Sequence, residues 1–406
     1  MKTLLGPKGY KPIIFTSPNV GNVSPRTARE IERQMSLPHG SYKDFHNLSH
    51  MAAREKALET AWHVVKGRFG KDQVLEVENG FRIFDYSLAE QMHIHLNEDQ
   101  KAADAGRITL LSDLSGLGFE VGLITPDPMK EEFLDLGFIY AAKNAGVPTK
   151  NIVYVNSKQD MNEVSVSFLR DCFTQIGKTV FINEDARSLS WNELKDRAPG
   201  LNWKYSRLGF GGEFVVAGKF AFMSNMSKEQ LNLARHSLNM NLYQAHMAVK
   251  TEAKKQLEQM GRTVFTLPPI WTDIIPPSVM KEIGTEKRIF TMMDHPDFIV
   301  LYPYLDNAIF FDRTYYKEHR DLIRRMLDII KPKRFATLPD EDGLPLNSMR
   351  LPFGGVYMDA AAERSTKVVQ SSGVKAHVSS IPFGAFRWGL HGGINCSTNI
   401  IWTAKS

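Results

Sequence analysis

The sequence predicts an α/β or α+β fold for a chain of 406 residues, with no clear linker between domains. Short apolar runs of strand length recur along the chain, and segments with helical spacing of apolar residues lie between them. Glycine and proline end many of these segments, as they do at turns and helix ends. The composition, 43% hydrophobic and 23% charged, is that of an ordinary globular protein. We find no clean sequence repeat.

Charge and cysteine content narrow the class of protein. The net charge is +5 and the pI about 8.9, but basic and acidic residues are interleaved, so we expect no nucleic-acid partner. Two cysteines, Cys172 and Cys396, are too few for a disulfide framework and are typical of a reducing compartment. The N-terminus does not resemble a signal peptide, and no apolar run is long enough to span a bilayer. We therefore expect a cytoplasmic protein with no membrane partner.

The first half of the chain is predicted to alternate between strands and helices. Expected strands cover residues 12–16, 107–111, 119–124, 151–155 and 179–182, and expected helices cover about 48–66, 130–145 and 162–175. Gly146 and Pro148 end the second helix, and Gly177 ends the third. Cys172 lies within the third helix beside Phe173, and we interpret it as a core residue.

The second half begins with a predicted hairpin in residues 213–224, turning at Gly218. A capping box at residues 227–230 opens a helix expected to reach about residue 260. Further expected elements are strands at 262–267, 290–303, 355–358, 375–379 and 400–402 and a helix at 365–370.

The segment before the last strand contains a lone cysteine in a glycine turn, His391-Gly392-Gly393-Ile394-Asn395-Cys396. Glycines permit an open backbone turn, and such a turn suits a reactive thiolate. A tight turn with Cys396 as a small core residue is the alternative.

Three further segments carry polar side chains in apolar surroundings. Asp185 follows the strand at 179–182. It would either bind a cation or lie at the solvent-exposed edge of a loop. Glu213 follows Gly211 and Gly212 at the start of the predicted hairpin. His295 and Asp297 are two residues apart on a segment expected to be extended, so both side chains would point to one face. They would form either a structural pair or a catalytic histidine beside a substrate-binding carboxylate.

Taken in order, these four motifs resemble those of the guanidino-group-modifying enzymes, the pentein superfamily. Its members include arginine deiminase, dimethylarginine dimethylaminohydrolase and glycine amidinotransferase. The family order is a strand-end Asp, an acid-Gly-Gly-acid hairpin, His-x-Asp and Gly-Gly-x-x-Cys, and the resemblance covers the C-terminal half to two-thirds of the chain. It implies a five-bladed, pseudo-symmetric α/β propeller and a single catalytic domain over residues 1–406. Residues 1–100 would be an N-terminal extension or elaboration.

The resemblance also implies residue roles. Asp185 and Asp297 would grip a planar guanidinium through its N–H groups. The Cys396 thiolate would attack the central carbon, and His295 would donate a proton to the leaving amine. The family acid before Gly-Gly is replaced by Phe210, so either Glu213 or another carboxylate such as Glu184 would support the histidine.

Three functions follow from this resemblance. The first is a deiminase-like hydrolase acting on arginine or an arginine derivative, the second is an amidinotransferase that uses the same covalent intermediate, and the third is a propeller-fold binding protein without catalysis. The partner would be a small guanidino compound or an arginine side chain of a protein. Arg187 and Arg387 are candidates for binding a substrate carboxylate or are surface residues. The chemistry requires neither a metal nor an organic cofactor.

Overall fold

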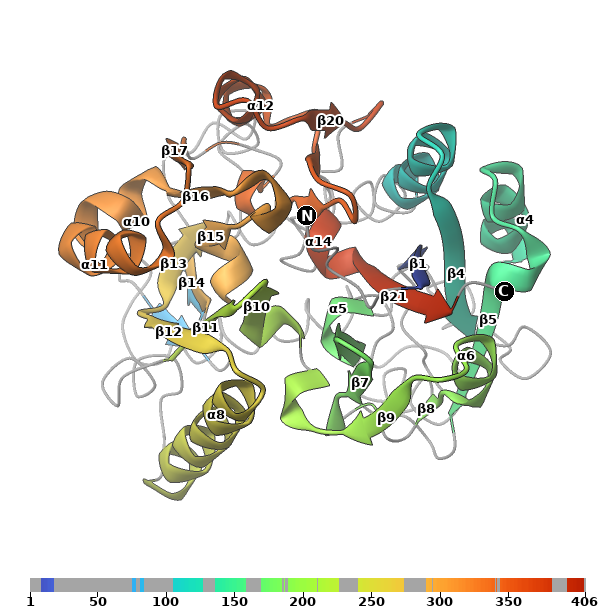
Figure 1. Cartoon of the computed structure of the whole chain (residues 1–406), viewed down its shortest axis with the longest axis horizontal. Coiled ribbons are helices and arrows are strands. Elements are labelled where there is room, and N and C mark those ends of the chain that lie inside the picture. Colours follow the sequence, from blue (N-terminus) through green and yellow to red (C-terminus); the bar gives the residue numbers. More distant parts are fainter. Residues whose placement is uncertain are drawn as a thin grey trace.

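The chain forms an α/β fold of mixed sheets. In Figure 1, helices such as α4, α8, α11 and α12 lie toward the rim, whereas α14, β10 and α5 lie toward the middle. The computed structural model describes residues 9–17, 75–77, 81–83, 105–126, 136–157, 169–184, 186, 189–209, 211–225, 240–273, 290–293, 295–339, 341, 344–381 and 393–404.

One pattern of strand pairing occurs five times among the described residues. In each unit the first strand pairs antiparallel with the second, and the second pairs parallel with the third. The units are β6 (Phe173–Ile176), β7 (Thr179–Ile182) and β9 (Asn202–Tyr205); β10 (Phe214–Ala217), β11 (Phe220–Ser224) and β12 (Thr263–Leu267); β15 (Val300–Leu301), β16 (Ala308–Asp312) and β17 (Arg334–Leu338); β18 (Met349–Arg350), β19 (Val356–Met358) and β20 (Ala376–Val378); and β21 (Thr398–Ala404), β1 (Tyr10–Thr16) and β4 (Glu120–Pro126).

A helix lies between the second and third strands of each unit, because parallel neighbours need a crossover connection. In unit order, the crossovers contain α6 (Asn192–Arg197), α8 (Met240–Gln259), α10 (Arg313–Glu318) with α11 (Arg320–Ile330), α12 (Glu363–Ser371) and the helix at residues 105–116. The α11 helix shows how these segments fold, since Ile323, Met326 and Ile330 recur at helical spacing and are buried.

The fifth unit joins the two ends of the described chain. β1 pairs with β21 along its whole length, from Tyr10 opposite Ala404 to Thr16 opposite Thr398. Its other edge pairs with β4. This sheet continues through β5 (Ile152–Ser157) to β8 (Leu189–Ser190), with α4 (Leu136–Asn144) between β4 and β5. The segment at residues 10–16 is therefore built into the same sheet as the strand that follows Cys396.

A separate antiparallel sheet has the order β13-β14-β3-β2. Its strands are β13 (Ile270–Asp273), β14 (Phe290–Met293), β3 (Phe81–Ile83) and β2 (Leu75–Val77).

A short helical turn comes just before the first strand of every unit. These turns are α5 (Leu169–Cys172), η6 (Gly211–Glu213), η7 (Pro296–Phe298), η9 (Pro345–Asn347) and α14 (Ile394–Ser397). They contact one another in a closed circuit, the ring of turns, in which α5 meets η6, η6 meets η7, η7 meets η9, η9 meets α14, and α14 meets α5. Side chains far apart in the sequence are thereby gathered at one end of the first strands. Other 3₁₀ turns among the described residues are η3 (Thr149–Asn151), η5 (Arg207–Gly209) and η8 (Tyr304–Asp306).

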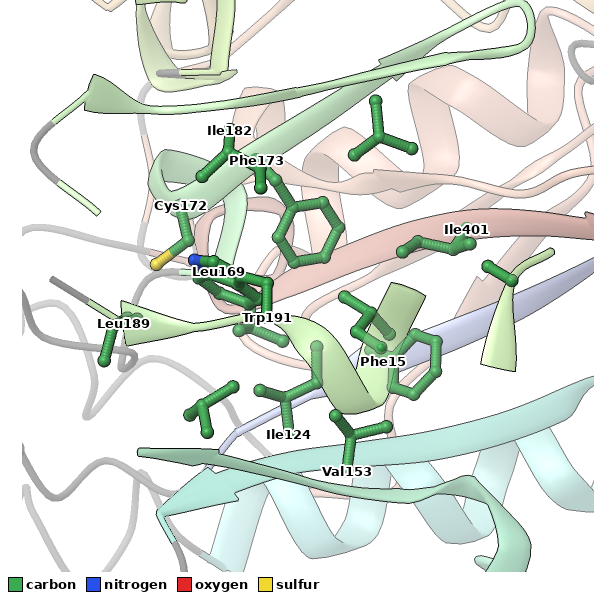
Figure 2. Packing of buried hydrophobic residues seen from close by; sticks show 14 of the residues in the cluster. Phe15, Ile124, Val153, Leu169, Cys172, Phe173, Ile182, Leu189, Trp191 and Ile401 are labelled. Atoms are coloured by element: carbon green, nitrogen blue, oxygen red, sulfur yellow. The ribbon is translucent and has the colours of Figure 1, made fainter. Parts of the chain in front are cut away.

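The fifth unit and the first share a hydrophobic core, seen in Figure 2. Phe15 and Ile401 contribute from β1 and β21, and Phe173 contributes from β6. The ring of Phe173 packs edge-on against that of Trp191, with centroids 5.5 Å apart. The indole Nε1 of Trp191 donates to the carbonyl oxygen of Ala186 at 3.1 Å, so its polar atom is satisfied inside the core.

Three sequence predictions of secondary structure are wrong. The expected strand at 107–111 belongs to the helix at 105–116, where Leu110, Leu111 and Leu114 are buried at helical spacing. Of the expected helix at 162–175 the described part is helical only at Leu169–Cys172, and β6 begins at Phe173 because this segment pairs with β7 across the turn at Gly177, whose φ is +63°. The expected strand at 290–303 is interrupted by the 3₁₀ turn Pro296–Phe298.

Most other predictions are confirmed where the structure describes the residues. The strands at 119–124, 151–155, 179–182 and 262–267, the hairpin around Gly218 and the helix at 365–370 are present with shifted ends. Cys172 is buried in the core, as expected. The expected helix at 48–66 lies outside the described residues. Within the described part of the chain, no helix has the length and apolar character needed to cross a membrane.

Replacing Ile401 by alanine should destabilise the fold, because this side chain is 0% exposed and fills the core between the first and fifth units. A buried Ile→Ala change costs about 2–5 kcal/mol, and a urea unfolding curve would show the loss. The matched change Ile329→Ala, at a side chain that is 56% exposed, should alter the free energy of unfolding by less than about 0.5 kcal/mol. Equal effects of the two substitutions would contradict the packing described here.

Candidate active site

Cys396 lies in the short turn α14, between Gly393 and the start of β21, and its side chain is buried. Its backbone N–H and that of Gly393 both donate to Asn347 Oδ1, at 3.2 and 3.1 Å. The hydroxyl of Thr398 donates back to the carbonyl oxygen of Ile394 at 2.8 Å. The glycine and hydroxyl residues around the cysteine therefore hold its turn in place. A Cβ atom at position 393 would lie 2.9 Å from Asn347 Oδ1, so this turn requires glycine.

The other end of the Asn347 amide joins the thiol to a carboxylate. Asn347 Nδ2 donates to Asp297 Oδ2 at 2.9 Å and to Cys396 Sγ at 3.1 Å. Asn347 is 1% exposed, so its rotamer is fixed by these partners and by the surrounding packing.

The two oxygens of Asp297 have different surroundings. Oδ2 accepts hydrogen bonds from Asn347 and Asn395, both at 2.9 Å, and lies 3.7 Å from Cys396 Sγ. Oδ1 is buried and has no hydrogen-bond partner among the described residues. A buried carboxylate oxygen without a donor is costly, so a donor brought to Oδ1 would stabilise the site.

A second carboxylate, Asp171, lies across the ring of turns. Its Oδ1 accepts from the Gly212 backbone N–H at 2.9 Å. A Cβ atom at position 212 would lie 2.5 Å from that oxygen and 2.9 Å from His295 Nδ1. Only glycine at this position allows Asp171 and His295 to approach each other, which accounts for one glycine of the Gly-Gly motif.

The charges within the ring shift the ionisation of its members. Burial raises the pKa of Asp171 to about 6, the nearby His295 opposes that shift, and Asp297 adds to it. Burial also raises the pKa of the Cys396 thiol well above its ordinary value, and the negative charges of Asp297 and Asp171 raise it further. In this state the thiol is protonated, and a cation bound between the carboxylates would favour the thiolate.

Glu213, predicted to support His295, is buried and forms an ion pair with the buried Lys250 of α8, with 3.3 Å between Lys250 Nζ and Glu213 Oε2. Asp171 is a carboxylate that the structure places near His295. Glu184, the other carboxylate considered from the sequence, is exposed. The role of Glu213 stays a prediction.

Of the site residues predicted from the sequence, Cys396 and Asp297 lie together, and His295 lies beside Gly212 and near Asp171. His295 and Asp297 do not lie on an extended strand as expected, because Pro296–Phe298 forms a 3₁₀ turn. That turn directs His295 toward Asp171 and Gly212, and Asp297 toward Asn347 and Asn395. Asp185, Arg187, Arg387 and Phe210 lie outside the described residues.

Two residues of the ring, Asp171 and Asn347, were missed by sequence reasoning. Both stand just before a short strand that opens an antiparallel pair, as Glu213 does before β10. A polar residue just before such a strand is a sequence signal for a site residue, but the sequence pattern predicts that Asp171 lies inside a helix. Among the described residues, no group of three or more histidine, cysteine, aspartate or glutamate side chains is placed to hold a metal ion.

No family model and no curated protein matches the chain by sequence. Solved structures do match it. The inosamine-phosphate amidinotransferase from Streptomyces griseus is 13% identical, with 76% of this chain and 80% of that chain covered and a TM-score of 0.41. The amidinotransferase of the saxitoxin pathway from Microseira wollei is 14% identical, with 65% of this chain and 80% of that chain covered and a TM-score of 0.39. DDAH from Pseudomonas aeruginosa, complexed with citrulline, is 13% identical, with 65% of this chain and 86% of that chain covered and a TM-score of 0.38.

All three are enzymes of the pentein superfamily, the family that the sequence motifs resemble. Identities and TM-scores this low bear on neither the substrate nor the reaction of this chain.

The charge at Asp297 should control the reactivity of Cys396. Because the raised pKa keeps the thiol protonated, iodoacetamide should alkylate Cys396 slowly at pH 7 and faster as the pH rises. Asp297→Asn removes a negative charge beside Sγ and keeps an oxygen for Asn347 and Asn395, so it should lower the thiol pKa and speed alkylation at pH 7 several-fold. Mass spectrometry of the Cys396 peptide measures the rate.

Asp328→Asn, at an exposed carboxylate on α11, is the matched control and should leave the alkylation rate unchanged. An unchanged or slower rate in Asp297→Asn would show that this carboxylate does not set the thiol pKa.

Proposed function

We propose that this protein is a cysteine-dependent enzyme that acts on the guanidino group of arginine or an arginine derivative and hydrolyses it as a deiminase does. The observation that carries the proposal is the buried Cys396 thiol beside two carboxylates, one of which, Asp297, has an oxygen with no partner among the described residues. This arrangement suits a substrate that is cationic, planar and rich in N–H donors.

The carboxylates would bind and orient the substrate. Asp297 Oδ1 accepts from one guanidinium N–H group, while Oδ2 stays held by Asn347 and Asn395. Asp171, on the facing turn, supplies the second negative charge. The substrate's positive charge offsets the two carboxylates and lowers the thiol pKa, so the nucleophile forms when the substrate is bound.

The reaction would proceed in two halves. The Cys396 thiolate attacks the central guanidinium carbon, forming a C–S bond, and His295 donates a proton to the departing nitrogen as its C–N bond breaks. The nitrogen leaves as ammonia or an amine, and an amidino thioether remains on Cys396. His295 then takes a proton from water, which attacks the same carbon and displaces the thiolate, so the product is a urea-type compound. An amine in place of water would complete an amidino transfer.

We also propose that the architecture is a five-bladed α/β propeller. The support is that five units share one strand-pairing pattern and that their entry turns contact one another in a closed circuit. In this arrangement each unit would contribute one turn to the active site.

Product analysis with arginine, agmatine and an arginine-containing peptide tests the proposed activity. We expect ammonia and a ureido product from at least one of them and loss of turnover by more than about 10³-fold in Cys396→Ala, because the covalent step is then impossible. The matched Cys172→Ala change removes the other thiol and should keep most of the activity. An amidino product that forms only with an added amine would establish a transferase instead. No turnover, with Cys396 unreactive toward 2-chloroacetamidine, would favour a binding protein.

The pH dependence of kcat/KM should show an acidic limb set by Asp171. Its pKa is about 6, so below pH 6 the side chain is protonated and loses the charge that attracts the substrate, whereas above pH 6 the charge is present. We expect kcat/KM to fall by about tenfold per pH unit below this value, since the profile reports the free enzyme. Asp171→Asn should lower kcat/KM and abolish the limb. Asp328→Asn should keep it, and a limb that survives in Asp171→Asn would assign it to another group.

A further inference from the structure

A cavity of about 400 Å³ runs along the first strands of several units. Its lining begins at Arg170 of α5 and Asn395 of α14 and reaches the far ends of β6, β10 and β21, at Gly177, Gly218 and Trp402. Its size falls in the range of pockets that hold small organic ligands, about 300–1,000 Å³.

The charged side chains that line this cavity are all basic. They are Arg170, Lys219, Arg262 and Arg350, and none of the other described residues that line it is acidic. Arg170 Nη2 and Arg350 Nη1 donate to the carbonyl oxygens of Phe214 and Val216, at 3.2 and 3.1 Å. Both guanidinium groups are thus held on the same strand, β10, although their charges repel each other.

Several polar atoms at the cavity have no hydrogen-bond partner among the described residues. Thr174 Oγ1 is one, and this side chain is only 6% exposed. The Nε atoms of Arg170 and Arg262 are buried and likewise have no partner among these residues. Burying such donors without an acceptor is costly, so an anion in the adjacent cavity would offset part of this cost through its charge.

The cost of this charge cluster appears in the ionisation of Arg350. Burial and the like charge of Arg170 lower its pKa to about 9, against the opposing charge of Asp297. An oxyanion between the two guanidinium groups would offset their repulsion and would accept the bidentate hydrogen bonds that arginine donates to phosphate and carboxylate.

We propose that this cavity, in addition to the reaction proposed at Cys396, binds a small organic oxyanion, a phosphomonoester or a polycarboxylate. Arg170 and Arg350 hold the anionic group, and Arg262 and Lys219 attract the anion from the outer part of the cavity. The cavity is larger than a bare phosphate ion needs, and the rings of Tyr304 and Trp402 provide apolar surface for the rest of the ligand.

Titration calorimetry with the full-length chain in a phosphate-free, low-salt buffer tests this site. The probes are glycerol 3-phosphate and citrate, with neutral glycerol as the negative control. We expect one molecule of glycerol 3-phosphate or citrate to bind per chain, and the preferred probe identifies the anion class. Glycerol should not bind. Binding of neither anion at millimolar concentration would overturn the proposal.

Substitutions separate a built site from general attraction to a basic protein. Arg262→Gln should weaken binding of the preferred anion about tenfold or more, because one charge-assisted contact is lost. The control Arg324→Gln removes the same charge from an exposed position on α11 and should leave binding unchanged.

Lys219→Gln, in the turn between β10 and β11, provides a second test should Arg262→Gln not fold. It should also weaken binding. Unchanged affinity in the folded cavity variants, or an equal loss in Arg324→Gln, would overturn the proposal. Because the measurement is binding rather than turnover, its result is independent of the reaction at Cys396.

Discussion

The site depends on the cost of burying the Asp297 carboxylate. A buried ionised carboxylate without partners is unfavourable by on the order of several kcal/mol, and each hydrogen bond to a charged group returns about 1.5–3 kcal/mol. Asn347 and Asn395 provide two such bonds, and they come from two different turns of the ring. The same Asn347 side chain holds the backbone of the cysteine turn. One carboxylate therefore links η7, η9 and α14.

Negatively and positively charged side chains lie close together near the ring of turns. Burial and the charges of Asp171 and Asp297 raise the pKa of the Cys396 thiol. Arg170 and Arg350 lie at the basic cavity, and Arg350 interacts electrostatically with Asp297. The negative side chains near the thiol would attract a cation and the positive side chains at the cavity would attract an anion, so neighbouring parts of the molecule have opposite ligand preferences.

Local pattern was enough to predict much of the fold and part of the site. The hairpin at Gly218, the helix at 365–370 and the buried strand after Cys396 all carry strong local signals, and the order of His295, Asp297 and Cys396 pointed to one chemistry. The sequence does not reveal Asp171 as a site residue, because apolar residues around it have helical spacing that predicts one continuous helix. Pairing with β7 instead makes the following residues the strand β6. Residues 107–111 look like a strand, and burial against the sheet makes them a helix. Both errors arise where tertiary contacts override local preference.

The pairing of β1 with β21 has a consequence for synthesis of the protein. Thr16 donates a hydrogen bond to Ser397 across 381 residues of sequence, so β1 leaves the ribosome long before its antiparallel partner exists. The turn that carries Cys396 is made together with β21, after the other four turns. Until β21 is made, one edge of the apolar strand β1 has no partner, although its other edge can pair with β4, and an unpaired strand edge is prone to aggregation. The position of Cys396 beside Asp297 therefore depends on one of the later segments to be synthesised.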